Sequence, residues 1–470
     1  MIEFILNNKE IITEQPPGYL LLDFVRYQKH LSGTKIGCRE GDCGACTVLV
    51  GDLMDGKLVY RSMTSCLLPL GNVHHKHIVT IEGTNLEKLN AVQQAMSDEG
   101  ATQCGFCTPG FVVSLTGFCL QQDKHSYDDA IASINGNICR CTGYKSIERA
   151  ASSIASLMQT KEEYKDAIDF VTENEILPIY FKTIKKRLLS LKNKSNGILQ
   201  QSDGKFLGGG TDLYVQQAEN MVHADIKFLY DASALKGIEK KNNKCIIGGA
   251  ATVTDILESA IFRDHFPKIS TFLKLVSSTP IRNMATIAGN FVNASPIGDF
   301  TIFFLALNAQ IKLREGSHSR LIPLQKFYKG YKELDKSPGE MIESIEFDLP
   351  GKNSFFNFEK VSKRTHLDIA SVNTAVYLEV ENEKIVNAFL SAGGVGPVPM
   401  VLKNSSVYLK NKEISTELID DMVEIMKEEI SPISDARGTK EYKILLLTQL
   451  VKAHFITLFP TLRLDDSMIL

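Results

Sequence analysis

The 470-residue sequence has few of the features that mark secreted, membrane-spanning or nucleic-acid-binding proteins. No stretch approaches the roughly 18 consecutive apolar residues of a membrane-spanning helix, and the N-terminus, MIEFILNNKEI, lacks the charged and apolar regions of a secretory signal. The net charge is only -3 and no basic patch stands out, which argues against nucleic acid as a partner. Internal repeats and low-complexity tracts are also missing. We therefore expect a soluble, cytoplasmic protein of several domains.

Cysteine, by contrast, is plentiful and concentrated in two groups. Eight of the ten cysteines fall into them: Cys38, Cys43, Cys46 and Cys66 in the first, and Cys104, Cys107, Cys139 and Cys141 in the second. Such grouping is typical of metal ligands rather than of disulfides. The two remaining cysteines, Cys119 and Cys245, are expected to be buried thiols.

The first group has the spacing of plant-type 2Fe-2S ferredoxins, in which a loop supplies three thiolates and a later segment the fourth. Gly41 and Gly44 lie between the ligands, where the loop must turn its amides towards sulfur without a Cβ in the way. A structural zinc site also takes four cysteines, but zinc ribbons usually arrange them as two CxxC hairpins. The spacing therefore favours an iron-sulfur cluster.

The second group lies at the predicted start of an apolar helix. Thr108 and Pro109 are predicted as its N-cap and first residue, so Cys104 and Cys107 fall just ahead of or within the first turn. A helix N-terminus stabilises thiolates, and the short GNICRCTGY loop can bring the other two cysteines beside it. Taken alone, this pattern is also compatible with zinc or a redox dithiol.

These runs, CREGDCGACTV, QCGFCTPGFVVSL and GNICRCTGY, resemble in order and spacing the iron-sulfur region of the molybdenum hydroxylases, a group that includes xanthine dehydrogenase and aldehyde oxidase. The resemblance implies a multidomain α+β fold. It begins with a β-grasp 2Fe-2S ferredoxin domain at 1–84 and a four-helix-bundle 2Fe-2S domain at 85–160. It further implies that each group of four cysteines binds one 2Fe-2S cluster.

The second half of the chain has two glycine-bearing segments that bear on a flavin. FLGGGTDL places three glycines between a strand and a predicted helix, a geometry that lets amides approach a pyrophosphate. It lacks the GxGxxG spacing of a Rossmann turn, and a glycine-rich turn without ligand looks similar. The later segment TIAGNFVNASPIGDF is predicted to be a polar loop, which suits a diphosphate or a surface position equally.

Both segments resemble the FAD-binding motifs of molybdenum-hydroxylase flavoproteins. The resemblance implies a linker at 161–175, a vanillyl-alcohol-oxidase-type FAD-binding domain at 176–352 and a C-terminal α+β flavoprotein domain at 353–470. The FAD contacts that it implies are Phe206, Leu207, Gly208, Gly209, Gly210, Thr211, Asp212, Leu213, Thr286, Ile287, Ala288, Gly289, Asn290, Ser295, Asp299, Ile342 and Lys360. Many family members carry Phe about ten residues before the Thr286 segment, where this chain has Val276, so the resemblance does not extend to an aromatic stack on the flavin.

Clusters and flavin on one chain, without the long molybdopterin-binding region, resemble the small subunit of two-subunit bacterial xanthine dehydrogenases. We therefore expect no substrate-oxidising residue on this chain. The partner is expected to be a large molybdopterin subunit in a heterotetramer or larger assembly, and NAD+ the final acceptor. Aldehyde-, nicotinate- or carbon-monoxide-oxidising enzymes, a standalone iron-sulfur flavoprotein reductase, and a redox sensor or scaffold remain as alternatives.

A further pattern, His74, His75 and His77, is predicted to be a solvated turn rather than a metal site.

Overall fold

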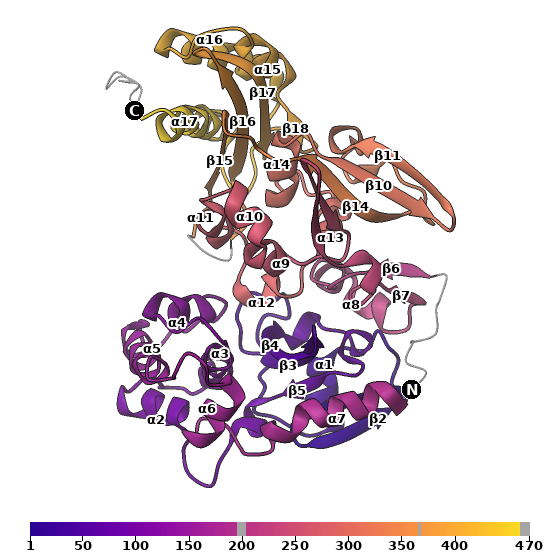
Figure 1. The fold of residues 1–470 in the computed structure, drawn as a ribbon, viewed down its shortest axis with the longest axis vertical. Coiled ribbons are helices and arrows are strands. Elements are labelled where there is room, and N and C mark those ends of the chain that lie inside the picture. Colours follow the sequence, from indigo (N-terminus) through magenta and orange to yellow (C-terminus); the bar gives the residue numbers. More distant parts are fainter. Residues whose placement is uncertain (195–203, 365–367, 461–470) are drawn as a thin grey trace. The chain divides into compact units, whose positions relative to one another are not determined.

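The computed structural model describes residues 1–194, 204–364 and 368–460. The chain forms two compact units (Figure 1). The first unit comprises Met1–Asp231 and Ser278–Ala285, and the second comprises Ala232–Ser277 and Thr286–Leu470. The predicted FAD-binding domain, 176–352, therefore contributes to both units.

The first unit begins with a five-stranded sheet. Its strands are β1 (Ile2–Leu6), β2 (Lys9–Thr13), β3 (Thr47–Met54), β4 (Lys57–Thr64) and β5 (His77–Val79), in the order β2-β1-β5-β3-β4. Side chains of β1 alternate between the two faces, as a strand requires. Phe4 packs with Phe24 on one face, where α1 (Leu21–Asp23) continues into the π-helix η1 (Phe24–Gln28). Ile5 packs on the other face against Leu188 of α7 (Phe181–Lys194).

Helices follow the sheet in the first unit. They are α2 (Ala91–Asp98), α3 (Thr108–Cys119), α4 (Tyr127–Ser133), α5 (Lys145–Met158) and α6 (Ala167–Glu173). Residues 110–119 of α3 are all buried, so this helix is the centre of the bundle. Capping boxes at Asn90 and Ser126 fix the starts of α2 and α4.

Two predictions about this region need correction. The stretch 161–175, predicted to be a linker, contains α6, whose Phe170 and Val171 are buried in the helical core. The polar composition of residues 161–175 gave no indication that Phe170 and Val171 are buried. The predicted N-cap Thr108 is the first helical residue, and Cys107 occupies the cap position.

The predicted solvated turn at His74–His77 is also wrong, because His75 and His77 are buried. Asn7 and Tyr60 satisfy the ring of His77: its Nε2 lies 2.8 Å from the Asn7 carbonyl and its Nδ1 lies 2.7 Å from the Tyr60 hydroxyl. A buried ring with both nitrogens bonded belongs to the core of the ferredoxin-like sheet. The sequence offered no sign of these distant partners.

The first unit is completed by a small α/β element and one returning segment. Two parallel strands, β6 (Lys205–Leu207) and β7 (Ile226–Phe228), flank α8 (Leu213–Val222). The segment Ser278–Ala285, which contains α12 (Thr279–Arg282), returns to this unit after the chain has entered the second.

The second unit contains two larger sheets. The first has the order β11-β10-β14-β9-β8, and the second has the order β15-β16-β17-β18. Strand bounds in the first sheet are β8 (Ile238–Lys241), β9 (Lys244–Gly248), β10 (Gln310–Glu315), β11 (His318–Pro323) and β14 (Met341–Asp348). Those in the second are β15 (Ser354–Val361), β16 (Val372–Glu381), β17 (Lys384–Gly393) and β18 (Met400–Val401), and β12 (Tyr328–Gly330) pairs with β13 (Glu333–Leu334).

Short helices and an aromatic core connect these sheets. The helices are α9 (Val253–Glu258), α10 (Ala260–His265), α11 (Ile269–Lys274), α13 (Ile287–Asn293) and α14 (Asp299–Ala306). Phe303 of α14 contacts the rings of Phe266 and Phe356 with centroid distances of 5.5 and 4.6 Å. On the second sheet lie α15 (Lys403–Leu409), α16 (Thr416–Glu429) and α17 (Lys440–Leu458).

Candidate iron-sulfur and flavin sites

The first four cysteines meet because two paired strands end beside one loop. Cys46 directly precedes β3, and Cys66 lies in the short turn that follows β4. Pairing of Thr47 with Thr64 brings these two thiols together, and both are 2% exposed. The loop itself supplies the other two, Cys38 and Cys43. Backbone amides point at sulfur here: Glu40 donates to the Cys38 Sγ over 3.3 Å, and Cys38 to the Cys43 Sγ over 3.4 Å.

The thiols of this group come in two hydrogen-bonded pairs. A hydrogen bond from the Cys43 thiol lowers the pKa of Cys38 to about 5, and the same bond raises that of Cys43. In the buried pair, the hydrogen bond with Cys66 lowers the pKa of Cys46 and raises that of Cys66. Two thiol pairs suit a cluster with two irons, since 2Fe-2S clusters are held by four thiolates.

The second four cysteines also come in pairs. The Sγ atoms of Cys104 and Cys141 lie 3.7 Å apart, and the Cys107 thiol hydrogen-bonds that of Cys139. Burial, followed by this bond, raises the pKa of Cys107 to about 12. Burial opposes ionisation of Cys139 as well, but hydrogen bonds from Thr142 outweigh it and its pKa is lowered. Among the described residues, no three or more His, Cys, Asp or Glu side chains converge as around a single metal ion.

The two thiol-bearing loops touch through their backbones. The amide of Ile138, next to Cys139, donates to the carbonyl of Cys43 over 3.0 Å. The Nδ2 of the buried Asn137 donates to the Gly44 carbonyl over 3.1 Å, and Ser114 donates to its Oδ1 over 2.8 Å. Gly44 has a φ of +67°, and a Cβ there would lie 2.4 Å from the Gly136 carbonyl oxygen. Only glycine allows this close approach.

The segment Ser278–Ala285 packs against both loops. The amide of Thr279 donates to the Asn135 Oδ1 over 2.9 Å, close to the second group of cysteines. A Cβ on Gly41, in the first loop, would lie 2.7 Å from the Cδ1 of Ile281. Asn283 donates to the carbonyl of Ser62 over 2.9 Å. Eight residues from the predicted FAD-binding region thus form part of the wall around both thiol groups.

The segment Phe206–Leu213 lies where the sequence placed it, between β6 and α8 of the first unit. A Cβ on the buried Gly209 would lie 1.8 Å from the Met284 carbonyl oxygen, so this glycine has a packing role of its own. Gly210 has a φ of +86°, and the Gly208 carbonyl accepts a hydrogen bond from Asn72 over 2.9 Å. Asp212 is the N-cap residue of α8.

The other predicted flavin residues lie in the second unit. Thr286 is the N-cap of α13, and its Oγ1 accepts from the Gly289 amide over 3.2 Å. Gly289 and Asn290 are therefore helical, which corrects the prediction of a loop at this point. Ile342 is buried in β14, and Ser295 is half-buried between α13 and α14.

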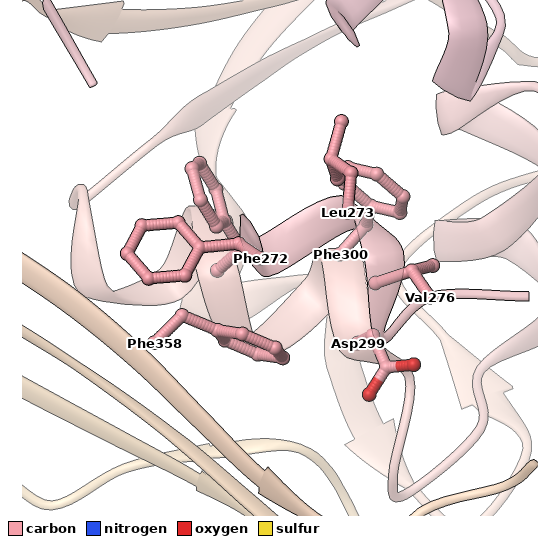
Figure 2. A pocket seen from close by; sticks show the side chains of 7 residues that line it. Phe272, Leu273, Val276, Asp299, Phe300 and Phe358 are labelled. Atoms are coloured by element: carbon pink, nitrogen blue, oxygen red, sulfur yellow. The ribbon is translucent and has the colours of Figure 1, made fainter. Parts of the chain in front are cut away.

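Asp299 opens α14 and forms an ion pair with Lys360 of β15, with 2.7 Å between the Asp299 Oδ2 and the Lys360 Nζ. Asp299 and Val276 both line a small pocket of about 180 Å³ together with Phe272, Phe300 and Phe358 (Figure 2). The sequence did not single out Asn373, which also bonds Asp299.

Four family models match the chain. A 2Fe-2S iron-sulfur cluster binding domain matches 4–70, and a [2Fe-2S] binding domain matches 80–152. The FAD binding domain in molybdopterin dehydrogenase matches 183–350, and the CO dehydrogenase flavoprotein C-terminal domain matches 358–458. The chain thus has two 2Fe-2S domains, an FAD-binding domain and a domain of the CO dehydrogenase flavoprotein C-terminal type. The predicted α+β multidomain fold is thereby confirmed, and so are two 2Fe-2S domains and an FAD-binding domain.

Curated relatives of this iron-sulfur flavoprotein include xanthine dehydrogenases. That of Emericella nidulans is 29% identical over 88% of this chain and 35% of its own length. The xanthine dehydrogenase/oxidase of Mus musculus is 26% identical over 93% of this chain and 37% of its own, and that of Gallus gallus 24% over 99% and 40%. The chain thus spans 35 to 40% of these relatives.

Solved structures share the fold. Carbon monoxide dehydrogenase from Hydrogenophaga pseudoflava matches with a TM-score of 0.52 at 21% identity, over 55% of this chain and 90% of its own. Quinoline 2-oxidoreductase from Pseudomonas putida 86 matches with a TM-score of 0.50 at 20% identity, over 55% and 89%. None of the described helices is both long and apolar enough to cross a membrane.

Proposed function

We propose that this chain is the electron-transfer part of a xanthine dehydrogenase, carrying electrons from a molybdopterin partner subunit to NAD+. The observation that carries the proposal is the gathering of eight thiols into two groups of two pairs within one compact unit. When bound, 2Fe-2S clusters carry electrons one at a time, whereas FAD accepts two and can pass on a hydride.

The residues present fit two clusters of this type. Cys38, Cys43, Cys46 and Cys66 would hold one, and Cys104, Cys107, Cys139 and Cys141 the other. Ligation requires thiolates; the structure lowers the pKa of Cys38 and of Cys139, while the hydrogen bonds that join them to Cys43 and Cys107 raise the pKa of those partners. Amide donors to sulfur in the first loop add further stabilisation of negative charge.

For FAD we propose the two sets of residues implied by the family resemblance. In the first unit these are residues 206–213, whose three glycines carry no Cβ that would keep a pyrophosphate from their backbone amides. In the second unit they are residues 286–290 with Ser295, Asp299, Ile342 and Lys360. The Lys360 ammonium is occupied by Asp299 and the Leu275 carbonyl, each at 2.7 Å, so it would act on FAD chiefly by orienting that carboxylate.

Xanthine is the proposed substrate of the whole enzyme because the xanthine dehydrogenases match this chain along 88 to 99% of its length. In the solved carbon monoxide and quinoline enzymes a shorter chain matches 55% of this one, with 90% and 89% of its own length aligned. An enzyme that oxidises another heterocycle, an aldehyde or carbon monoxide is the second candidate. The molybdopterin subunit, a heterotetrameric or larger assembly and NAD+ as acceptor belong to the same proposal.

The first test separates the two thiol groups. The purified protein should contain about four irons with two distinct EPR signals, because each 2Fe-2S cluster needs four thiolates. Cys107→Ser should remove one signal and Cys43→Ser the other. Cys119→Ser is the matched control: this thiol is fully buried in α3 and belongs to neither group, so both signals should remain.

Stoichiometric zinc without iron would contradict the assignment of the clusters. Loss of both signals from either cysteine variant, in folded protein, would contradict the division of the ligands into these groups. Assays of the native complex with xanthine, with and without NAD+, test substrate and acceptor. Cluster reduction by carbon monoxide or an aldehyde but not by xanthine would favour the second candidate.

A further inference from the structure

The Asp299 carboxylate is fixed through both of its oxygens. Lys360 of β15 donates to Oδ2 over 2.7 Å, and Asn373 of β16 donates to Oδ1 over 2.7 Å. Lys360 and Asn373 are direct partners in the register of the two strands, so both donors reach the carboxylate from one point in the sheet. The Lys360 side chain is 1% exposed and that of Asp299 is 14% exposed. Only the aspartate keeps an edge towards solvent.

The surroundings allow a single orientation of the Asn373 amide. Its Nδ2 faces two acceptors, the Asp299 Oδ1 and the Ile297 carbonyl at 3.1 Å, so the nitrogen must point that way. Its Oδ1 is buried and has no hydrogen-bond partner among the described residues. A buried acceptor without a partner costs stability, so folding alone gives a poor reason for asparagine here.

The neighbouring strand leaves room for this amide. Gly393 of β17 is the register partner of Asn373, and a Cβ there would lie 2.2 Å from the Asn373 Oδ1. Any larger residue at 393 must displace the amide or the strand. Residues of three adjacent strands, β15, β16 and β17, therefore fix the carboxylate of Asp299, the first residue of α14.

We propose that Asn373 is a positioning residue for FAD: it holds the Asp299 carboxylate in the orientation that accepts a hydrogen bond from the cofactor. This rests on the proposed function, in which Asp299 contacts FAD. Each carboxylate oxygen retains acceptor capacity after one hydrogen bond, so the exposed edge remains available. Asn373 lies within 358–458, the flavoprotein C-terminal domain, and not in the matched FAD-binding domain at 183–350. The C-terminal domain thereby shapes the flavin site.

Lys360 also contacts the segment that lines the neighbouring pocket. Lys360 donates to the carbonyl of Leu275, the residue before Val276. Val276 and Asp299 line the same pocket (Figure 2). Loss of the donor at the Asp299 Oδ1 would free the carboxylate to rotate about the single remaining ion pair.

The test measures FAD dissociation from the full-length protein, whose flavin has been removed and is titrated back, with the cluster EPR signals as a check on folding. Asn373→Leu should weaken FAD binding by about ten- to a hundredfold, the range expected for one hydrogen bond to a charged group. Gly393→Ala should act in the same direction by displacing the amide. The matched control is Asn357→Leu, an equally buried asparagine of β15 that bonds Glu359 and His454 instead; FAD affinity should stay unchanged while stability falls.

A double-variant cycle separates positioning from general destabilisation. If Asn373 acts through Asp299, then Asn373→Leu should weaken FAD binding no further in an Asp299→Asn background. Additive losses of affinity, or unchanged affinity in folded Asn373→Leu, would overturn the inference and leave the proposed function intact. Wild-type protein that binds no FAD would refute the proposed function, and the inference with it.

Discussion

Gly44 is the position at which one added methyl group should disturb both thiol groups. It lies in the first loop, between Cys43 and Cys46, and a Cβ there would lie 2.4 Å from the Gly136 carbonyl and 2.5 Å from the Asn137 Nδ2 of the second loop. The far side of the contact is backbone, which cannot swing away as a flexible side chain can. Gly44→Ala must therefore separate the loops or distort them.

Two costs contribute to the magnitude. A residue with a side chain at a left-handed φ costs roughly 1 to 2 kcal/mol, and forcing an extra carbon into a packed contact costs roughly 1 to 3 kcal/mol. Gly105→Ala is a matched control: Gly105 lies between Cys104 and Cys107 and has a φ of +80°, but nothing lies within 4 Å of its added Cβ. It should show the first cost without the second.

The assay combines urea unfolding, followed by far-ultraviolet circular dichroism, with iron content and EPR. We expect Gly44→Ala to lose roughly 2 to 5 kcal/mol and to alter both cluster signals. Gly105→Ala should lose the smaller amount and alter only the signal of the second group. Equal losses in the two variants, or a Gly44→Ala protein with one signal untouched, would refute the packing argument.

Protonation of His77 and close packing at Gly209 give two further predictions. Burial lowers the pKa of His77 to about 3, against about 6.5 in an unfolded chain. The unfolded state therefore takes up the proton first, and stability should fall by about 1.4 kcal/mol per unit as the pH drops below about 6.5. His77→Gln should flatten this slope in urea titrations at several pH values. An unchanged slope would show that protonation of His77 does not cause the pH dependence of stability. Gly209→Ala should lower flavin content and thermal stability together, because its Cβ would lie 1.8 Å from the Met284 carbonyl oxygen; full flavin content would disprove this.

Local patterns predicted much of the fold. The apolar run after Cys107, predicted to be a helix, forms α3, and the strand and helix predicted on either side of the glycines in FLGGGTDL are β6 and α8. The short spacings between cysteines in the sequence also identified all eight members of the two groups, because ligands supplied by one loop lie close together in sequence. These features depend on residues within a few positions of one another.

Features that depend on distant partners could not be predicted. Asn373 and Asp299 are 74 residues apart, and only the sheet register brings them together. Gly209 was interpreted as a place for a pyrophosphate, yet its neighbour is the Met284 carbonyl. A large substitution such as Gly209→Glu would thus mix flavin loss with misfolding, since any side chain meets this backbone. His77 was assigned to a turn because Tyr60 and Asn7 are not its neighbours in sequence.

The path of the chain limits how freely the iron-sulfur and flavin halves can be exchanged between related proteins. The chain crosses the boundary of the units after Asp231, Ser277 and Ala285, so a single recombination point cannot separate them cleanly. A crossover after Asp231 would leave the segment Ser278–Ala285, including Ile281, to be supplied by the other parent. That segment must pack its Ile281 side chain against the loop at Gly41 and donate a hydrogen bond to Asn135 in the second loop. Chimeras should therefore succeed when these eight residues travel with the iron-sulfur half.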